Sequence, residues 1–271
     1  NIIYKETVSY KIAIPSYSRT DQLKGKTLAM LQRHNIDFSK ISIFVDGNEQ
    51  YEEYKEALKE YPTLTIVNNK EGKGIGQARN YIREYFNHGD YVFGLDDDVE
   101  EIFKCDFGET PNMNRLKVIS NLDEWVNECF EKCADMKLNF WGVPSFDNAF
   151  FMKPESSTNL KYIGGVCVGL IIDKMKEPIR VNINHFEDYE FCCRHFLRDG
   201  GILRFNDIGL KSNFYNKKGG ICATYNGLEN RLLDGAVVAE YLKKEYPKMC
   251  SIIKNKKRNC VNIRLNHHFN C

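Results

Sequence analysis

The 271-residue sequence contains no long apolar run, no internal repeat and no low-complexity block. No uninterrupted apolar stretch approaches the roughly 20 residues that span a bilayer, and the first residues lack a basic region followed by an apolar one. Lys and Arg number 38 and Asp and Glu 37, so the net charge of +1 excludes a polycation that coats nucleic acid by bulk charge alone. We therefore expect a cytoplasmic protein that makes no membrane contact.

The ten cysteines lack the spacing of a metal site. No C-x-x-C pair occurs, so a structural zinc site is poorly supported. Cys129 and Cys133 are four residues apart on an expected helix, and Cys192 and Cys193 fall on the apolar side of another. Because buried free cysteines behave as small hydrophobic residues, we predict reduced thiols in the core.

What the sequence does have is enough apolar material for a core, with 42% hydrophobic residues and 13% aromatic ones, which excludes a disordered chain. Through the first 100 residues short apolar runs alternate with helical periodicity, and Thr20 or Asp21 is expected to cap the first helix. Such strand–helix units predict an α/β fold, a mostly parallel sheet flanked by helices. The predicted strands cover residues 11–15, 41–45, 64–67 and 91–95.

The pattern changes beyond residue 100. A long amphipathic helix is expected over 122–136 and a strand over 139–143. A glycine-rich apolar stretch follows at 162–172, and a further helix is expected from about 186 to Gly200 and Gly201. We expect one domain over residues 1–271. Its parts are a first half of about 1–100, a second half of about 101–240 and a basic segment at 241–271.

The neutral total charge conceals a dipole. Residues 243–268 carry eight Lys or Arg and one acid, whereas residues 96–109 carry seven acids and one lysine. The densest acidic point is Asp96-Asp97-Asp98 at the end of the fourth predicted strand, where open α/β sheets bind ligands. Adjacent carboxylates repel one another, and Mg²⁺ or Mn²⁺ would neutralise them. The alternative is a solvated acidic turn.

A glycine-rich segment, residues 72–80, opens the helix before that strand. Glycines let a ligand approach the backbone closely, and a helix N-terminus favours phosphate. The segment lacks the Lys-Ser/Thr of a P-loop and does not follow the first strand as a dinucleotide fingerprint does. The segment becomes a candidate ligand site because the strand after its helix ends at the acidic triplet.

Four motifs in this order and spacing resemble the nucleotide-sugar half of a GT-A glycosyltransferase, a Rossmann-like fold. They are residues 14–19 (IPSYSR), 45–47 (VDG), 76–80 (GQARN) and 95–98 (LDDD). The resemblance implies a UDP-sugar donor and Mn²⁺ or Mg²⁺, with Asp98 and Asp96 at the metal and aromatic Phe140 and Trp141 at the sugar pocket. The donor-binding residues it implies are Pro15, Ser16, Tyr17, Arg19, Asp46, Glu49, Gly76, Arg79, Asp96, Asp97 and Trp141.

In the second half, residues 186–190 (FEDYE) resemble the acidic acceptor-side motif of the same family. Both carboxylates lie in the first turn of a helix, whose dipole favours their charged form, as a general base requires. The resemblance implies Asp188 as the catalytic base and Glu187 as second choice, with inversion of configuration; a retaining mechanism stays open. Simple stabilisation of the helix by first-turn acids is the alternative. A metal-ligand histidine is common in the family, and the candidates here are His185, His267 and His268.

The whole pattern is similar to the TET/JBP-associated glycosyltransferases of phages and protists, which are thought to glycosylate hydroxymethylated pyrimidines in DNA. This likeness implies DNA as the acceptor, in the cytoplasm of a phage-infected cell. The alternatives are a glycan or lipid-linked acceptor, a nucleotidyltransferase that makes sugar nucleotides, and a binding module with a decayed site. The basic residues expected to contact DNA phosphates are Lys217, Lys218, Lys256, Lys257 and Arg258.

Overall fold

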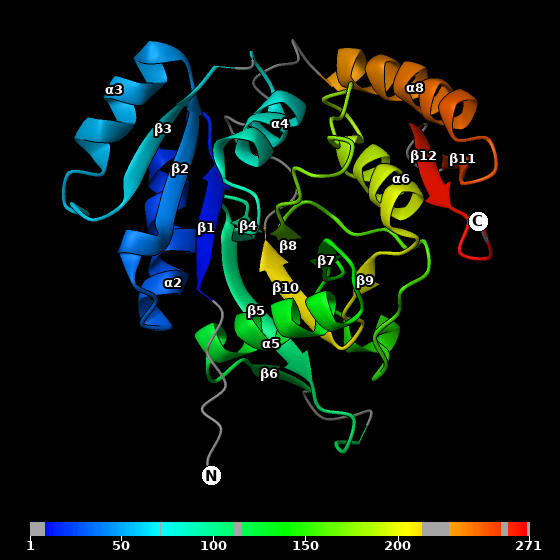
Figure 1. Ribbon diagram of the computed structural model, residues 1–271, viewed down its shortest axis with the longest axis horizontal. Helices are drawn as coiled ribbons and strands as arrows, with labels where there is room; N and C mark the ends of the chain where they lie inside the picture. The colour runs from blue at the N-terminus through cyan, green and yellow to red at the C-terminus, as the bar shows by residue number, and fades with distance from the viewer. Residues whose placement is uncertain (1–8, 71, 111–114, 213–227, 256–259, 270–271) are drawn as a thin grey trace.

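The computed structural model describes residues 9–70, 72–110, 115–212, 228–255 and 260–269. A central sheet has helices on both faces, as Figure 1 shows, with a small sheet at one end and a helix with a hairpin at the C-terminal side. Seven cysteines in the described part are free and buried, which confirms the prediction of core thiols. Among the described residues no helix is both long and apolar enough to cross a membrane.

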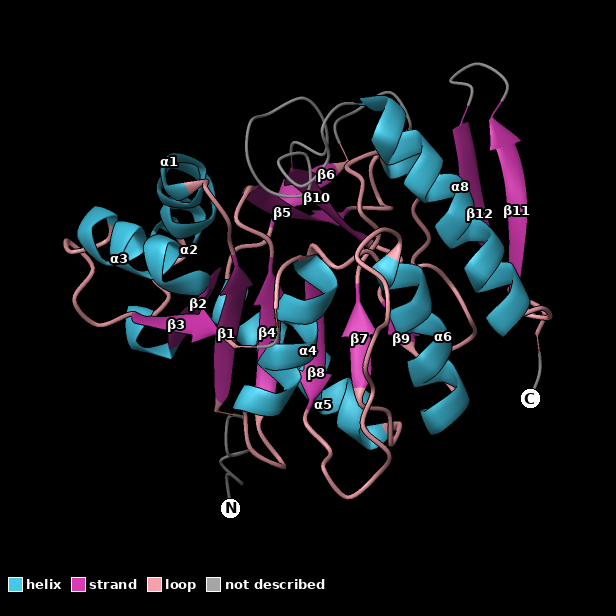
Figure 2. Cartoon of the chain, turned by 90° about the horizontal axis from the view of Figure 1, so that it is seen from above, coloured by secondary structure: helices cyan, strands magenta, loops and turns pink. Residues whose placement is uncertain are grey.

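The central sheet has seven strands in the order β3-β2-β1-β4-β8-β7-β9 (Figure 2). The first four predicted strands are present and run parallel, as expected. β8 is antiparallel to both β4 and β7, and β9 is parallel to β7, so β4, β7 and β9 point the same way. Their carboxyl ends therefore meet at one edge of the sheet. The strands are β1 Tyr10–Pro15, β2 Ile41–Asp46, β3 Thr65–Asn69, β4 Tyr91–Leu95, β7 Phe140–Gly142, β8 Cys167–Ile171 and β9 Leu203–Arg204.

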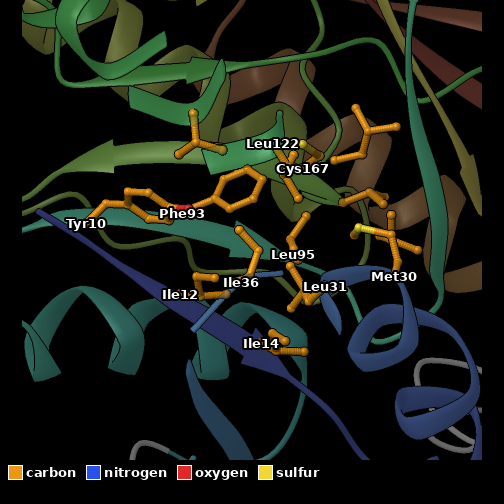
Figure 3. Packing of buried hydrophobic residues seen from close by; sticks show 14 of the residues in the cluster. Tyr10, Ile12, Ile14, Met30, Leu31, Ile36, Phe93, Leu95, Leu122 and Cys167 are labelled. Carbon is orange, nitrogen blue, oxygen red and sulfur yellow. The ribbon is translucent and has the colours of Figure 1, made fainter. Parts of the chain in front are cut away.

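Successive residues of a strand face opposite sides, and this alternation divides the core between two layers. Ile12 and Ile14 pack with residues of the first helix and α5, while Ala13 packs with residues of α4 and α6 (Figure 3 shows part of the first cluster). The helices are α1 Thr20–Leu23, a π-helical turn Lys24–Leu28, α2 Ala29–Arg33, α3 Gly47–Ala57, α4 Ile75–Tyr85, α5 Leu122–Asp135 and α6 Glu187–Asp199, with short 3-10 turns at Phe38–Lys40 and Ala149–Phe151.

One sequence expectation needs correction. Arg19, not Thr20 or Asp21, is the residue before the first helix, and no side chain caps it. The preceding Ser18 has a φ of 51°, and this turn sets the start of the helix. The glycine-rich apolar stretch 162–172 contains β8 in its second half.

Two smaller units flank the sheet. β5 Val99–Cys105 starts directly after Asp98 and lies between β10 Ile208–Ser212 and β6 Leu116–Val118. β10 is antiparallel to β5, which brings Ser212 opposite Val99, at the carboxyl end of β4. The second unit is the C-terminal α8 Leu228–Glu245, packed on a hairpin of β11 Cys250–Asn255 and β12 Cys260–Leu265.

Candidate active site

The acidic triplet follows β4 at the edge where the parallel strands end. Asp97 and Asp98 are buried and Asp96 is half-buried, so the alternative of a solvated acidic turn is wrong. The backbone N–H of Asp96 donates to the Val166 carbonyl at 3.0 Å, which fixes the turn against the start of β8. The three carboxylates then face three different groups of partners.

Asp97 joins the loop after β1 to the end of β4. Ser16 Oγ donates to Asp97 Oδ2 at 2.6 Å, and the Arg19 guanidinium lies 3.1 Å from Oδ1. The Tyr54 hydroxyl of α3 lies 2.7 Å from Ser16 Oγ and accepts from the Arg19 backbone N–H at 3.1 Å. Burial raises the pKa of Asp97, and the Ser16 and Arg19 contacts oppose that rise. The predicted residues Ser16, Arg19 and Asp97 are thus brought together. Tyr54, for which the sequence suggested no role in a site, completes the set.

Asp98 faces the small sheet. Ser212 Oγ at the end of β10 donates to Asp98 Oδ1 at 2.6 Å, and Arg19 lies 3.5 Å from Oδ2. No sequence signal pointed to Ser212, which lies 114 residues further along the chain.

Arg79 of α4 links the acidic triplet to the acids of α6. Its guanidinium lies 3.2 Å from Asp96 Oδ1 and 2.6 Å from Glu187 Oε1. Burial disfavours the charge of Arg79, but Glu187 and Asp96 outweigh it, and the pKa of Arg79 lies above its usual value. Burial raises the pKa of Asp96 to about 7 although Arg79 opposes the rise. A Cβ on Gly165 would overlap the guanidinium, so this site needs glycine there, a requirement that the sequence did not reveal.

Asp188 follows Glu187 on α6 and faces Tyr162. The Tyr162 hydroxyl donates to Asp188 Oδ2, and its ring stacks on Tyr189 with centroids 4.4 Å apart. Burial raises the pKa of both Asp188 and Glu187, and the Tyr162 hydrogen bond and the Arg79 charge oppose the rise at Asp188. The two predicted catalytic carboxylates therefore lie together within reach of Arg79. Tyr162 is a residue that sequence reasoning missed.

In the glycine-rich loop, side chains of the protein accept the hydrogen bonds of two glycine N–H groups. Gly74 has a φ of 102°, and its N–H donates to Asp46 Oδ2 at 3.1 Å. The Gly76 N–H donates to Asn184 Oδ1 at 2.9 Å, and a Cβ on Gly76 would overlap the Ile183 carbonyl. The expectation that a ligand approaches this backbone is wrong at Gly76, because the segment before α6 occupies the space. We do not retain Gly76 as a donor ligand.

Trp141 does not line a sugar pocket. It has no exposed surface and stacks on Phe93 at 5.8 Å, with Trp125 and Phe130 edge-on to it. Phe140 is equally buried, against α6. An aromatic pair on an internal strand packs into the two layers, one residue on each side.

The other predicted donor residues lie around the same edge. Pro15 lines an apolar cavity under α4 and α6 that Arg79 and Asp188 also border. Tyr17 and Asp46 are half-buried, and Glu49 is exposed in the first turn of α3.

The histidine candidates lie apart from the triplet. His185 stacks on Phe186 and lies 3.4 Å from Asp234 of α8, and His267 Nδ1 lies 2.7 Å from the Leu160 carbonyl. His268 is exposed. Within the described ranges no three His, Cys, Asp or Glu residues converge as a metal site. The predicted nucleic-acid contacts Lys217, Lys218, Lys256, Lys257 and Arg258 lie outside the described residues.

The oxygen donors present still suit a hard cation. Mg²⁺ and Mn²⁺ bind through one or two carboxylates and complete their shells with water and substrate phosphates. Asp96 and Asp98 supply two such carboxylates on one turn, and the elevated pKa of Asp96 reflects both burial and the crowding of negative charge there. These residues fit a divalent cation that arrives with a phosphorylated ligand.

Known proteins share this fold. The chain resembles glucosyl-3-phosphoglycerate synthase from Mycobacterium tuberculosis, solved with Mn²⁺, UDP and glucosyl-3-phosphoglycerate, with a TM-score of 0.54 and 9% identity over 96% of this chain and 88% of that one. It also resembles residues 1–349 of TarS from S. aureus, with a TM-score of 0.51 and 12% identity over 87% and 66% of the two chains. No curated protein sequence matches. The family model for the TET-associated glycosyltransferases matches residues 10–220. The chain therefore belongs to the TET-associated glycosyltransferase family and is a glycosyltransferase with the GT-A fold.

Proposed function

We propose that this enzyme transfers a sugar from a UDP-sugar to the hydroxyl of a hydroxymethylated pyrimidine in DNA, with a divalent cation and inversion at the anomeric carbon. One observation carries the proposal. Arg79 bridges Asp96, at the donor end of the sheet, and Glu187, which is adjacent to Asp188 on the acceptor side, over 3.2 and 2.6 Å. A single guanidinium thus connects the two groups of acids that a transfer reaction needs side by side.

On the donor side, we assign the nucleoside to the residues at and just after the ends of β1 and β2, namely Pro15, Tyr17, Arg19, Asp46 and Glu49. Asp98 and Asp96 would hold Mn²⁺ or Mg²⁺, which stabilises the charge on the departing diphosphate when it is bound. The Mn²⁺ and UDP in the similar mycobacterial synthase support this assignment. Asp97 positions the donor loop through Ser16 and Arg19.

On the acceptor side, we assign Asp188 as the base. It accepts the proton of the incoming hydroxyl as the oxygen attacks the anomeric carbon from the face opposite the diphosphate, so the configuration inverts. The Tyr162 hydrogen bond and the Arg79 charge favour the carboxylate form that a base requires. Arg79 faces the diphosphate side as well, where negative charge develops during departure.

The family description supports DNA as the acceptor, since the glycosyltransferases it names are TET-associated. A pyrimidine inside a duplex has to leave the base stack to reach Asp188. The predicted basic residues Lys217, Lys218, Lys256, Lys257 and Arg258 remain candidates for phosphate contacts. A glycan or another non-DNA acceptor is the alternative; the nucleotidyltransferase alternative is dropped because the chain belongs to a glycosyltransferase family.

The test is the intact mass of a 5-hydroxymethylpyrimidine oligonucleotide after incubation with Mn²⁺ and pooled UDP-sugars. We expect a gain of one sugar, whose mass separates pentose, hexose and N-acetylhexosamine. An oligonucleotide with 5-methylcytosine at the same position, which lacks the hydroxyl, is the matched control and should gain nothing. UDP release only in the presence of sugars or glycans would retain the glycosyltransferase and remove DNA as acceptor.

A further inference from the structure

Three cations, Lys153, Lys161 and Arg204, lie on β9 and on the loop that runs alongside it, at the end of the central sheet opposite β3. Arg204 ends β9 and pairs with Gly142 at the end of β7, which points the same way as β4. Arg204 therefore lies at the same edge as Asp96. Three strand spacings separate β4 from β9 in the sheet order, a distance of about 14 Å. Asp188 borders the same cavity as Pro15 and Leu95, the last residues of β1 and β4, and so lies at this edge too. Figure 2 shows its helix, α6, beside β7 and β9.

Backbone hydrogen bonds hold the segment that carries Lys153, and that leads on to Lys161, alongside β9. The Lys153 N–H donates to the Asn206 carbonyl at 3.0 Å, and Ser157 exchanges two backbone hydrogen bonds with Arg204 at 2.9 and 2.8 Å. Lys161 directly precedes Tyr162, whose hydroxyl holds Asp188. The cations thus come from two segments, the loop before β8 and β9 itself, and Lys161 is adjacent in sequence to the residue that contacts the proposed base.

These cations have no carboxylate partner in the part of the chain that the structure describes. Arg19 and Arg79 are each paired with an acid, whereas Arg204 forms no ion pair within the described residues, and its Nε is buried without a hydrogen-bond acceptor, as is Arg19 Nε. Burial, Arg204 and Lys153 lower the pKa of Lys161, and burial lowers the pKa of Arg204. Lys161 therefore lies close enough to Arg204 and Lys153 to feel their positive charge, with no acid of the described residues paired with any of the three.

We propose that Lys153, Lys161 and Arg204 form a phosphate-binding subsite for the acceptor. The inference rests on the proposed function, because it places the ligand on the acceptor side of Asp188. Phosphate matches this donor set, since the planar guanidinium binds two of its oxygens at once and each lysine adds a point charge. The phosphate belongs either to a nucleic-acid backbone or to a small phosphorylated acceptor.

The test compares the wild type with the triple variant Lys153→Gln, Lys161→Gln and Arg204→Gln. The probes are a fluorescein-labelled single-stranded 5-hydroxymethylcytosine oligonucleotide, followed by anisotropy at several salt concentrations, and glycerol 3-phosphate, followed by calorimetry. We expect at least a tenfold loss of affinity for one probe. For the oligonucleotide, the slope of log affinity against log salt should fall by about 2, the value for three released counterions on a single strand. Arg204→Lys should recover part of the affinity, because it restores the charge without the planar fork.

Lys59→Gln is the matched control, because Lys59 is an exposed lysine beyond α3 on the donor half, paired only with Glu56. Loss of the oligonucleotide alone assigns the subsite to a nucleic-acid phosphate, and loss of glycerol 3-phosphate alone to a small acceptor. Unchanged affinity for both probes in a variant that keeps the wild-type melting temperature would overturn the proposal, as would a wild type that binds neither probe saturably. UDP binding with Mn²⁺ is measured on the same samples and should be unchanged. If the wild type does not bind UDP, the proposed function fails whatever the phosphate result.

Discussion

The catalytic centre and the β9 side of the central sheet carry opposite charge imbalances. At the catalytic centre five carboxylates surround two guanidinium groups, and the burial of this excess negative charge raises the pKa of Asp96, Asp97, Glu187 and Asp188. Beside β9, Lys153, Lys161 and Arg204 form no ion pair with an acid of the described residues, and burial lowers the pKa of Lys161 and Arg204. The difference sets the ligand that we expect on each side: a divalent cation with a diphosphate at the first, and a phosphate group of the acceptor at the second.

The largest effect should come from breaking the catalytic centre at its base. Asp188→Asn keeps the hydrogen bond to Tyr162 possible but cannot accept the acceptor proton, so we expect transfer to fall by about 10²–10⁴-fold. UDP affinity in the presence of Mn²⁺ should stay unchanged. Transfer is followed by product mass and UDP affinity by calorimetry. A fully active Asp188→Asn enzyme would move the base to Glu187.

The second largest effect should come from removing Asp98, one of the two carboxylates proposed to hold the divalent cation. Asp98→Ala should lower the affinity for UDP in the presence of Mn²⁺ at least tenfold and leave the weaker metal-free affinity unchanged, because two carboxylates plus phosphate oxygens make up the shell. Asp106→Ala is the control, since Asp106 is an exposed carboxylate directly after β5. Equal UDP affinity of wild type and Asp98→Ala with Mn²⁺ would remove Asp98 from the metal assignment.

The third effect is a dependence of stability on pH. The pKa of Asp96 is about 7 in the folded protein and near 3.8 in the unfolded chain, and the pKa of Glu187 is also raised. The folded state binds more protons between these values, so the free energy of unfolding should fall as the pH rises from about 4 to 7. Thermal unfolding from pH 5 to pH 8 measures the fall in melting temperature. Asp96→Asn should flatten the curve; an unaltered slope in that variant would assign the dependence to other groups.

The smallest effect should come from Tyr162→Phe, which removes one hydrogen bond from Asp188. Since that bond lowers the pKa of Asp188, its loss should shift the acidic limb of the pH profile of kcat/KM to higher pH and reduce the rate at low pH by less than tenfold. Tyr85→Phe, an exposed tyrosine on α4, is the control. A uniform loss at every pH without a shift would mean that Tyr162 only supports the packing.

Much of the donor half could be predicted from the sequence because its signals are local. An apolar run followed by polar residues marks a strand and its end, and this alone placed β4 and the acids after it. The first-turn acids of α6 were found because residues 186–190 resemble a short family motif, which is also a local signal. The prediction that Trp141 lines the sugar pocket failed, because an apolar run does not show which of its side chains line a pocket and which pack in the core.

The sequence by itself determined the order of strands and helices in the first half, the acidic triplet at the strand edge and the pair Glu187 and Asp188, since these depend on patterns within a few residues. Only the tertiary structure decided which partner each carboxylate has. Ser212 reaches Asp98 across 114 residues, and Tyr162 reaches Asp188 across 26. The same holds for the cations Lys153, Lys161 and Arg204, which are unremarkable as single residues. Charge acts through space, so a site that depends on the sum of distant charges becomes visible only when the chain has folded.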